Sequence, residues 1–225
     1  MAAPAHEQLW IAGFGPGLGV ALAARFAREH WRVLALSRSA PKPMLPSGAH
    51  VVLDLLAADA AARLAQLIAE HGAPRVLVYD VGVFRRAAFA ALREDDFRAC
   101  WEGMALGAFR VAQAVLPAMT QAGGGTLIFS GATASLRGGA EFAAFASAKF
   151  ALRGLAQALA RAYQPQGVHV AHTILDGALA DSARAGQYAA RLDPAAVADA
   201  YWHLAQQTPG AWTHELDLRG ADEPF

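Results

Sequence analysis

The sequence predicts a single α/β domain built on a doubly wound, mostly parallel sheet of seven strands with helices on both faces. Short β-rich runs alternate with helical stretches along the chain, and a glycine-rich turn joins the first run to the first helical stretch. Strands that alternate with helices form crossover units whose strands are parallel. Such crossovers are right-handed in nearly all known proteins, which directs the helices onto the faces of the sheet.

The expected strands are seven β-rich runs: Leu9–Ala12, Trp31–Leu36, His50–Leu53, Arg75–Tyr79, Thr126–Ser130, Val168–Ile174 and Trp212–Leu218. The expected helices are five longer stretches: Val20–His30, Ala57–His71, Glu94–Gln121, Phe142–Tyr163 and Pro194–Gln207. Alanine is frequent in these helices, which fits its high helix propensity and close packing.

Length and composition fit one domain that spans residues 1–225. Hydrophobic residues make up 55% of the chain, which is enough to fill the core of one α/β unit of this size. The proline-rich stretch 40–46 is short enough to be a surface loop. No linker divides the chain into further domains, and no repeat of fixed period occurs in it.

The charges are balanced, with 19 basic and 19 acidic residues, so we expect no nucleic-acid partner and no anionic membrane surface. No apolar run reaches the roughly 18 residues of a membrane-spanning helix. Residues 1–8 lack the basic and apolar regions of a secretory signal, and Cys100 has no second cysteine to pair with. These features predict a protein of the reducing cytoplasm.

No His-Glu-x-x-His, Cys-x-x-Cys or Gly-x-Ser-x-Gly motif occurs, so we expect neither a metal site nor a hydrolase. His169 and His172 lie three residues apart on an expected strand. Because side chains alternate along a strand, the two rings face opposite sides and cannot chelate one metal ion together. We expect structural roles for both histidines and a buried position for Cys100.

The run Gly13-Phe14-Gly15-Pro16-Gly17-Leu18-Gly19 follows a short apolar strand and opens an alanine-rich amphipathic helix. A strand, a glycine turn and a helix in this order form a cradle for the phosphates of a dinucleotide. Missing side chains let the backbone approach the pyrophosphate, and the amino terminus of the helix offers N–H groups and the positive end of its dipole. The spacing of Gly13, Gly17 and Gly19 is Gly-x3-Gly-x-Gly, and Gly-x-Gly-x-x-Gly does not occur in this run.

This spacing resembles that of the short-chain dehydrogenase/reductase family, and later segments follow in the family's order over nearly the whole chain. The segment Tyr79-Asp80-Val81-Gly82 is similar to the family's Asn-Asn-Ala-Gly, and the helix from Lys149 onward has a family-like sequence. The resemblance implies a Rossmann-type domain that binds a nicotinamide dinucleotide, with Asp54 meeting the adenine amino group. The residues that it places beside the cofactor, in addition to the glycine turn, are Asp54, Leu55, Asp80, Gly82, Lys149 and Gly177.

The catalytic positions of the family are altered in this chain. In the family, a Tyr exchanges the substrate proton, a Ser polarises the carbonyl group and an Asn supports a water relay. A Lys lowers the pKa of the Tyr and holds the nicotinamide ribose. Here Phe145, Ala132 and Met104 stand at the Tyr, Ser and Asn positions, and only Lys149 is kept. Three of the four roles therefore fall to groups that cannot transfer a proton.

Several other groups could take over the missing chemistry. Lys149 could act as the acid–base itself if burial lowered its pKa. Thr133 or Ser135 could bring a hydroxyl to a substrate carbonyl, or could instead bridge the backbone of their loop. Asp176, in the Asp-Gly pair that replaces the family's Pro-Gly, could donate a proton, or could instead cap a turn. For Asp80 we expect acceptance of backbone N–H bonds rather than chemistry.

The end of the second expected strand bears on the choice of cofactor. It reads Leu36-Ser37-Arg38, without the acid that NAD-preferring members place there for the ribose 2′-hydroxyl. Arg38, with Ser37 beside it, could pair with a 2′-phosphate, or could be a solvated loop charge. We therefore expect NADP(H) to be the preferred cofactor, with NAD(H) as the alternative.

These features predict an NADP(H)-dependent oxidoreductase that acts on a carbonyl, alcohol or imine group of a small molecule, through an atypical site at Lys149. The alternative is a homologue that binds the nucleotide but has lost chemistry, and serves as a sensor or a partner subunit. The sequence does not identify the substrate. Residues 178–192, which the resemblance makes the substrate lid, form a short and alanine-rich segment.

The resemblance also implies self-association, because family members commonly pair their fourth and fifth helices across a two-fold axis, and the last strand often forms a second interface. In this chain the corresponding helices carry more apolar residues than one sheet-facing stripe needs. We therefore expect a dimer or tetramer. The apolar residues of the two helices are Trp101, Met104, Phe109, Val115, Phe150, Leu152, Leu155 and Leu159.

Overall fold

The computed structural model describes residues 7–40, 45, 47–179 and 191–221. The strands of its main sheet are β1 (Gln8–Ala12), β2 (Arg32–Ser37), β3 (Ala49–Val52), β4 (Val76–Tyr79), β5 (Gly125–Ser130), β6 (Val168–Asp176) and β9 (Glu215–Arg219). Its α-helices are α1 (Leu18–Ala27), α2 (Ala60–His71), α3 (Glu94–Trp101), α4 (Gly107–Gln121), α5 (Ala143–Tyr163) and α6 (Pro194–Ala205).

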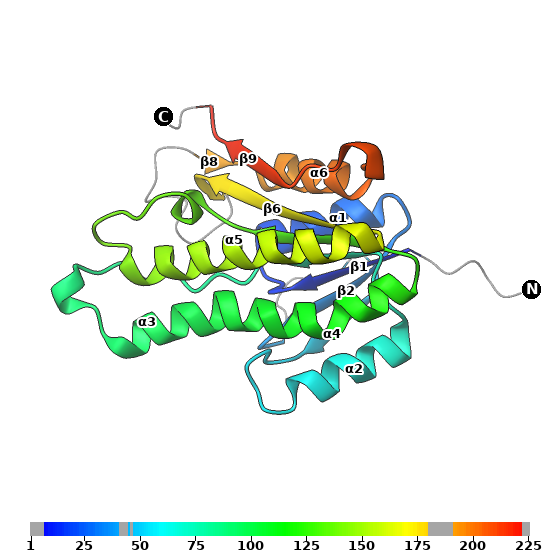
Figure 1. Cartoon of the computed structure of the whole chain (residues 1–225), viewed down its shortest axis with the longest axis horizontal. Coiled ribbons are helices and arrows are strands. Elements are labelled where there is room, and N and C mark those ends of the chain that lie inside the picture. The colour runs from blue at the N-terminus through cyan, green and yellow to red at the C-terminus, as the bar shows by residue number, and fades with distance from the viewer. Residues whose placement is uncertain (1–6, 41–44, 46, 180–190, 222–225) are drawn as a thin grey trace, which may run out of the picture.

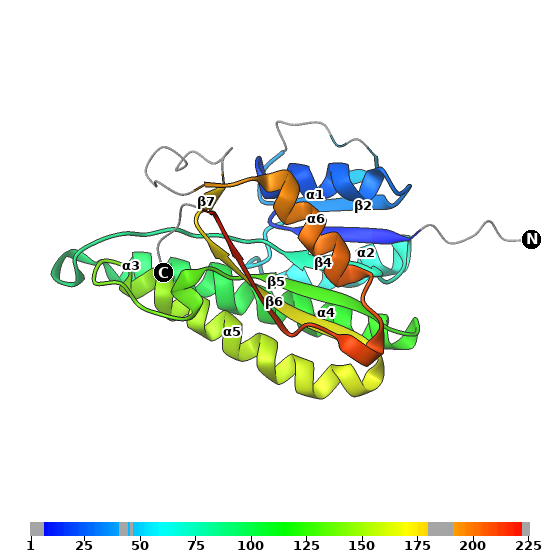
Figure 2. The ribbon, with the colours of Figure 1, turned by 90° about the horizontal axis from the view of Figure 1, so that it is seen from above.

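The expected fold class is confirmed. Over the described residues the seven strands form one sheet in the order β3-β2-β1-β4-β5-β6-β9, and each neighbouring pair is parallel (Figure 1). Helices α1 and α6 cover one face of the sheet, and α2, α4 and α5 cover the other (Figure 2). The chain order reverses at β1, which lies between β2 and β4, and ligands of such sheets bind beyond the carboxyl ends of the strands at this point.

Two details of the sheet differ from expectation. The last strand begins at Glu215 rather than Trp212, because the Trp212 indole stacks on the His169 ring, 5.2 Å between centroids, and donates to the Gln207 carbonyl oxygen at 3.1 Å. A short additional pair, β7 (Ala178–Leu179) with β8 (Arg191–Leu192), flanks residues 180–190. Most of the segment expected to be a substrate lid therefore lies outside the described residues.

The stretch expected as one helix over Glu94–Gln121 is interrupted by a π-helical turn at Glu102–Leu106, between α3 and α4. Tyr79 accounts for the interruption, because its hydroxyl donates to the Gly103 carbonyl oxygen at 2.5 Å. A Cβ atom on Gly107 would lie 2.4 Å from that hydroxyl, so the helix leaves room for the tyrosine only with glycine there. π-Helical turns of this kind are frequent at functional sites.

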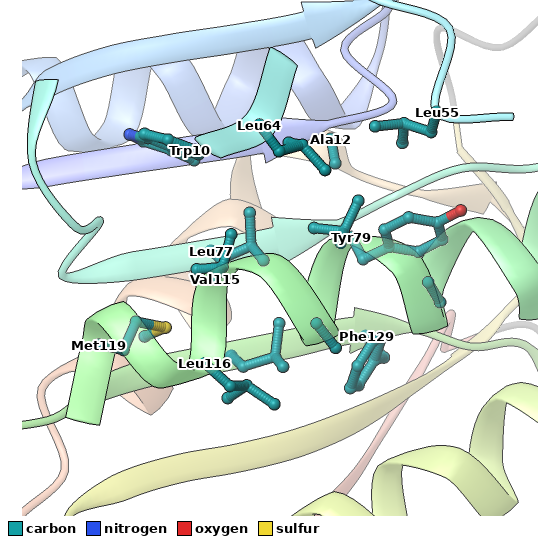
Figure 3. Packing of buried hydrophobic residues seen from close by; sticks show 14 of the residues in the cluster. Trp10, Ala12, Leu55, Leu64, Leu77, Tyr79, Val115, Leu116, Met119 and Phe129 are labelled. Carbon is teal, nitrogen blue, oxygen red and sulfur yellow. The ribbon is translucent and has the colours of Figure 1, made fainter. Parts of the chain in front are cut away.

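Two large hydrophobic clusters form most of the core of the described residues, beside a small one at Cys100 and Met104. One fills the space between the sheet and α2, α4 and α5, where Trp10, Leu77 and Phe129 of the strands meet helix residues such as Leu64 and Val115 (Figure 3). The other lies between the sheet and α1 and α6. Each cluster buries the apolar stripe of its helices, which is the main source of stability for such layers.

The apolar residues of α3, α4 and α5 divide between core and surface. Met104, Val115 and Leu152 are 0% exposed, so these three belong to the core and not to an apolar surplus at the surface. Leu155 and Leu159 also pack against the core. The exposed members are Trp101, Phe109 and Phe150, at 43%, 45% and 44%. Within the described residues, no helix is both long and apolar enough to cross a membrane.

Candidate active site

The glycine turn between β1 and α1 packs tightly on one side and is open on the other. Gly13 has φ 96°, and a Cβ atom there would lie 2.8 Å from the Asp80 carbonyl carbon, so only glycine lets the turn contact the segment after β4. Gly17 has φ 83° and precedes α1, where no side chain caps the first turn within the described part of the chain. A Cβ atom on Gly15 would have no described neighbour closer than 4.0 Å. The open side therefore fits a phosphate group.

The remaining residues of this turn have different environments. Leu18 and Gly19 are buried, and a Cβ atom on Gly19 would lie 3.2 Å from the Phe14 ring, so these two residues serve packing. Pro16 is exposed at the tip of the turn. The backbone N–H groups of Gly13 and Phe14 both donate to the Leu36 carbonyl oxygen at 2.9 Å, which ties the turn to the end of β2.

Three polar residues lie at the end of β2 and on the neighbouring strand β3. Ser37 Oγ donates to the Ser39 carbonyl oxygen at 2.7 Å and lies 2.8 Å from His50 Nε2. Arg38 is exposed beside them. No motif in the sequence singles out His50, whose place follows from the parallel register of Ala35 with His50. The three side chains form a potential anion site next to the glycine turn.

Asp54 and Leu55 follow β3. Asp54 is exposed, and its Oδ1 atom accepts a hydrogen bond from the Leu56 backbone N–H at 2.9 Å, which leaves the other carboxylate oxygen to face a ligand. Leu55 is buried at 8% exposure. Gly82 is exposed, and a Cβ atom on it would have no described neighbour within 4 Å.

Lys149 lies on α5 with 5% exposure, and its Nζ atom donates to the Ser130 carbonyl oxygen at 2.6 Å. Phe145 lies one turn earlier on the same helix, so the two side chains share a face. The Lys149 Nζ atom is 5.7 Å from the centroid of the Phe145 ring. This ring is half-buried and packs edge-on against Phe84, at 5.2 Å between centroids. The ammonium group is thus bordered by an aromatic wall without a hydroxyl.

Asp80 follows β4, and two side chains act on its carboxylate, while the expected acceptance of backbone N–H bonds stays a prediction. It makes a hydrogen bond with the Ser130 hydroxyl and interacts with the charge of Lys149. Burial is the larger effect and raises the pKa of Asp80 to about 6, although both contacts favour the ionised form. The buried carboxyl group therefore changes its protonation state close to neutral pH.

Behind Asp80, a row of hydroxyl groups extends into the face of the sheet covered by α6. Ser130 Oγ lies 2.9 Å from the Tyr201 hydroxyl, which in turn lies 2.5 Å from Thr173 Oγ1. Tyr201 is 0% exposed, and burial raises its pKa. The sequence signals neither Tyr201 nor Thr173, because they contact Ser130 only through the packing of α6 on the sheet.

Asp176, at the end of β6, is 3% exposed and is held at both carboxylate oxygens. Its Oδ1 atom accepts a hydrogen bond from Thr133 Oγ1, and its Oδ2 atom lies 2.5 Å from Arg219 Nη2. Gly177, which follows it, has φ 140°. The carboxylate is ion-paired and caps no helix among the described residues, and its role in proton transfer stays a prediction.

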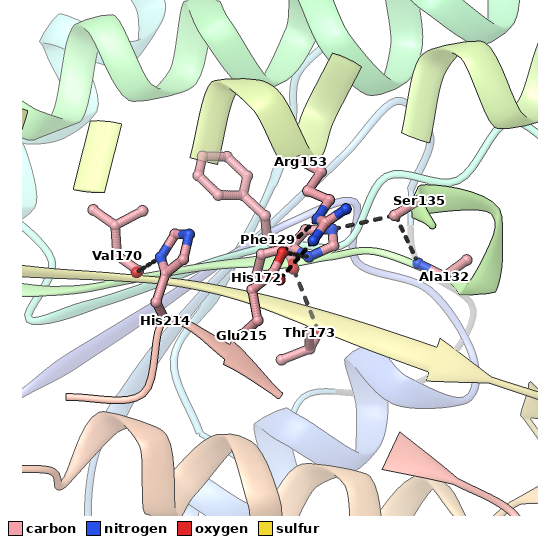
Figure 4. Close-up of polar contacts among 9 residues, drawn as sticks. All are labelled: Phe129, Ala132, Ser135, Arg153, Val170, His172, Thr173, His214 and Glu215. Atoms are coloured by element: carbon pink, nitrogen blue, oxygen red, sulfur yellow. Dashed lines mark hydrogen bonds and ion pairs between the residues drawn. The ribbon is translucent and has the colours of Figure 1, made fainter. Parts of the chain in front are cut away.

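Ser135 lies at the end of the 3-10 turn Thr133–Ser135 and is 0% exposed. Its Oγ atom accepts a hydrogen bond from the Ala132 N–H at 3.2 Å and lies 3.2 Å from His172 Nε2 (Figure 4). It therefore bridges the loop backbone, one of the two roles considered. Burial lowers the pKa of His172 to about 4, so the ring is neutral near pH 7. Thr133 is the half-exposed hydroxyl of this turn.

Met104 and Cys100 are both 0% exposed and pack together against α5. The described residues contain no group of three or more His, Cys, Asp or Glu side chains that could hold a metal ion. The open glycine turn, the polar ends of β2 and β3 and the buried lysine all lie where the carboxyl ends of the strands meet. Such an arrangement defines a dinucleotide-binding α/β domain.

A family sequence model described as short chain dehydrogenase matches residues 8–185. The chain belongs to the short-chain dehydrogenase/reductase family. Among curated relatives, the 3-oxoacyl-(acyl-carrier-protein) reductase MabA of Mycobacterium avium is 30% identical over 159 residues, which are 70% of this chain and 62% of that protein. The chain thus spans less than two thirds of the length of this relative.

Solved structures give the same fold. A short-chain dehydrogenase from Rhodopseudomonas palustris is 34% identical, with a TM-score of 0.81 over 95% of this chain and 98% of that chain. An alcohol dehydrogenase from the archaeon Thermococcus sibiricus, complexed with 5-hydroxy-NADP, has a TM-score of 0.80 at 21% identity, over 96% of this chain and 97% of that chain. The similarity to the Thermococcus sibiricus enzyme supports the fold alone.

Proposed function

We propose that this protein is an NADP(H)-dependent oxidoreductase that acts on a carbonyl, alcohol or imine group of a small molecule at a site centred on Lys149. The observation that carries the proposal is the buried Lys149 ammonium, held at the Ser130 carbonyl oxygen at the same edge of the sheet as the open glycine turn. The names of the relatives, which are reductases and dehydrogenases, favour an enzyme over a silent nucleotide-binding homologue.

The cofactor, when bound, supplies or accepts a hydride. The residues that would hold it lie in a row along the sheet edge. Gly15, Gly17 and the first turn of α1 would meet the pyrophosphate, since that side of the turn has room for it. Lys149 would hold the nicotinamide ribose, with Asp80, Gly82 and Gly177 lining that end. Asp54 would meet the adenine amino group through its second carboxylate oxygen.

The preference for NADP(H) rests on the ends of β2 and β3. Arg38 is exposed and can present its guanidinium group to a 2′-phosphate, with the Ser37 hydroxyl beside it. His50 lies 2.8 Å from that hydroxyl. No described acidic side chain forms a hydrogen bond or ion pair with Ser37 or His50, so the potential anion site is not neutralised by a carboxylate.

The proton chemistry falls to Lys149 with Asp80 as its neighbouring acid. Phe145 has no hydroxyl, and the Thr133 hydroxyl donates its hydrogen to Asp176, so neither donates a proton to a substrate in this arrangement. Lys149 can donate from its ammonium group, and the neighbouring Asp80 can return a proton to it, because the Asp80 pKa of about 6 lies close to neutrality. A substrate that already carries a positive charge, such as an iminium ion, needs no such donor.

A screen tests the proposal directly. Binding of NADPH and NADH is measured by calorimetry, and NADPH oxidation is followed with a panel of ketones, aldehydes and imines. We expect NADPH binding and turnover of at least one panel member, with poor rates on neutral ketones because the usual acid is missing. Absence of NADPH binding would overturn the proposal. Binding without turnover of any panel member would favour the silent homologue.

Self-association belongs to the same proposal. The exposed side chains Trp101, Phe109 and Phe150 lie on α3, α4 and α5, the helices that family members commonly pair. Single exposed apolar residues are common, but three large ones on adjacent helices favour an interface. We propose that two copies of the chain meet on this surface. The cytoplasmic location stays a prediction.

A further inference from the structure

Two chains of contacts run from β9 across β6 to the turn Thr133–Ser135. The register of the sheet places Glu215 opposite His172 and Arg219 opposite Asp176. On each strand the two residues are four positions apart, so they share a face. His172 meets Ser135 at one end of the turn, and Asp176 meets Thr133 at the other. The turn is therefore held at both ends from the last strand of the sheet.

The first chain of contacts joins Arg153, Glu215, His172 and Ser135 through hydrogen bonds and one longer polar contact, between Glu215 and His172. Arg153 donates to both carboxylate oxygens of Glu215, at 2.6 and 2.9 Å (Figure 4). Glu215 Oε1 lies 3.5 Å from His172 Nδ1, which makes no hydrogen bond with the described residues. The carboxylate favours the tautomer with the proton on Nδ1, which we assign on this ground. His172 Nε2 is then free to accept from the Ser135 hydroxyl.

The ring of His172 has little freedom in this position. It is 0% exposed, and a Cβ atom on Gly131 would lie 2.2 Å from its Nε2 atom. Ser135 is equally buried, and its Oγ atom accepts from the Ala132 N–H. The contacts thus transmit the position of β9 to the backbone of Ala132, the residue at the family's serine position.

The second chain of contacts fixes the orientation of the Thr133 side chain. Arg219 pairs with one oxygen of Asp176, and Thr133 donates its hydroxyl hydrogen to the other. The Thr133 hydroxyl oxygen can still accept a hydrogen bond, and Thr133 is half-exposed at the site. Loss of the Arg219 charge would free the carboxylate to turn away from the hydroxyl.

We propose that Glu215, His172 and Arg219 are positioning residues, through which the last strand holds the Ala132–Ser135 turn in place beside the substrate. The holding of the turn stands on the contacts alone. Its consequence for turnover rests on the proposed function. Glu215, His172 and Arg219 do not need to touch the substrate for this role.

Amide hydrogen exchange, read residue by residue by NMR on the full chain, tests the holding of the turn. Ser135→Ala and Glu215→Gln should raise exchange at the Ala132 amide at least tenfold, while the Ile128 amide in the middle of β5 changes less than twofold. Ser135→Thr, which keeps a hydroxyl, should restore protection. Asp59→Asn is the control, since Asp59 is exposed before α2 and its side chain makes no cap hydrogen bond there. It should change neither amide.

Steady-state kinetics tests whether holding the turn in place affects turnover. Glu215→Gln and Arg219→Met should lower kcat at least fivefold on the best panel substrate, with the KM for NADPH changed less than twofold, whereas Asp59→Asn should leave both unchanged. Unchanged exchange at Ala132 in both Ser135→Ala and Glu215→Gln, or an equal rise at Ile128, would overturn the inference. Raised exchange at Ala132 with an unchanged kcat would overturn the claim that the held turn affects turnover. Lack of NADPH turnover in the wild type would instead count against the proposed function and leave the exchange result standing.

Discussion

The Lys149 ammonium lies 5.7 Å from the centre of the Phe145 ring, one helical turn away on the same face of α5. The sequence resemblance predicts that this pair stands at the positions of the family's proton-donating Tyr and of the Lys that activates it. The lysine is therefore kept in a buried, hydrogen-bonded position, while the group that it would activate is reduced to a phenyl ring.

Restoring the hydroxyl groups should create or raise carbonyl reduction. In a Phe145→Tyr, Ala132→Ser double variant, Lys149 is already placed to lower the pKa of the new phenol. We expect NADPH-dependent reduction of simple ketones to rise about 100-fold, the lower range for a general acid. Initial rates of NADPH oxidation measure it. Phe84→Tyr, which adds a hydroxyl to the neighbouring ring, is the control and should give no such gain. Equal rates in wild type and double variant would contradict the assignment of Phe145.

Arg38→Ala should weaken NADPH binding at least tenfold, about 1.4 kcal/mol, and leave NADH binding nearly unchanged. The reason is the loss of a charge-assisted contact with the 2′-phosphate. Calorimetry on the purified protein gives both affinities. Arg32→Ala is the matched control, because Arg32 is exposed at the opposite end of the same strand. An unchanged NADPH affinity in Arg38→Ala would refute this role.

The raised pKa of Asp80 makes a prediction for stability. The folded protein holds the Asp80 proton up to about pH 6, whereas the unfolded chain releases it near pH 3.9. The contribution of this group is therefore present at low pH and is lost as pH rises from about 4 to 6. Relative to Asp80→Asn, the wild-type free energy of unfolding should fall by about 1–3 kcal/mol over this range.

Denaturant unfolding at several pH values measures this difference. Asp54→Asn, which changes an exposed aspartate outside the buried row, should show the wild-type trend. A wild type and an Asp80→Asn variant with parallel pH profiles would mean that Asp80 titrates in the folded protein as it does in the unfolded chain.

Association through α3, α4 and α5 should be sensitive to charge. Phe109→Glu would bury a carboxylate in the proposed interface. We therefore expect the dissociation constant of the dimer or tetramer to rise at least tenfold. Light scattering at micromolar protein concentration measures the mass of the assembly. Val52→Lys, at a residue 50% exposed on the edge strand β3, is the control and should leave the mass unchanged. A monomeric wild type would refute the interface.

The sequence predicted the layers of the fold because the apolar periodicities of its strands and helices are long and regular. It also placed Lys149 and the glycine turn at one edge, since the carboxyl ends of parallel strands meet there. The π-helical turn could not be foreseen, because it depends on the Tyr79 hydroxyl reaching Gly103 across the fold. The same holds for Tyr201, which meets Ser130 from the opposite helix layer.

Contacts between distant segments also decided the roles of single side chains. Asp176 was considered as a proton donor, but Arg219, more than forty positions later in the chain, pairs with its carboxylate. Ser135 was considered as a catalytic hydroxyl, yet His172 and the Ala132 N–H engage it in the core. Spacing along the chain contains no information on such partners.

The central claim is that Lys149 is the functional centre of an NADPH-dependent oxidoreductase. The most direct measurement compares single-substrate turnover and NADPH affinity of the wild type with those of Lys149→Met, which keeps the length and apolar stem of the side chain. We predict wild-type turnover of a carbonyl or imine substrate, a loss of at least 100-fold in Lys149→Met, and NADPH binding weakened by no more than about tenfold. A Lys149→Met protein that reduces the same substrate at the wild-type rate would contradict the account.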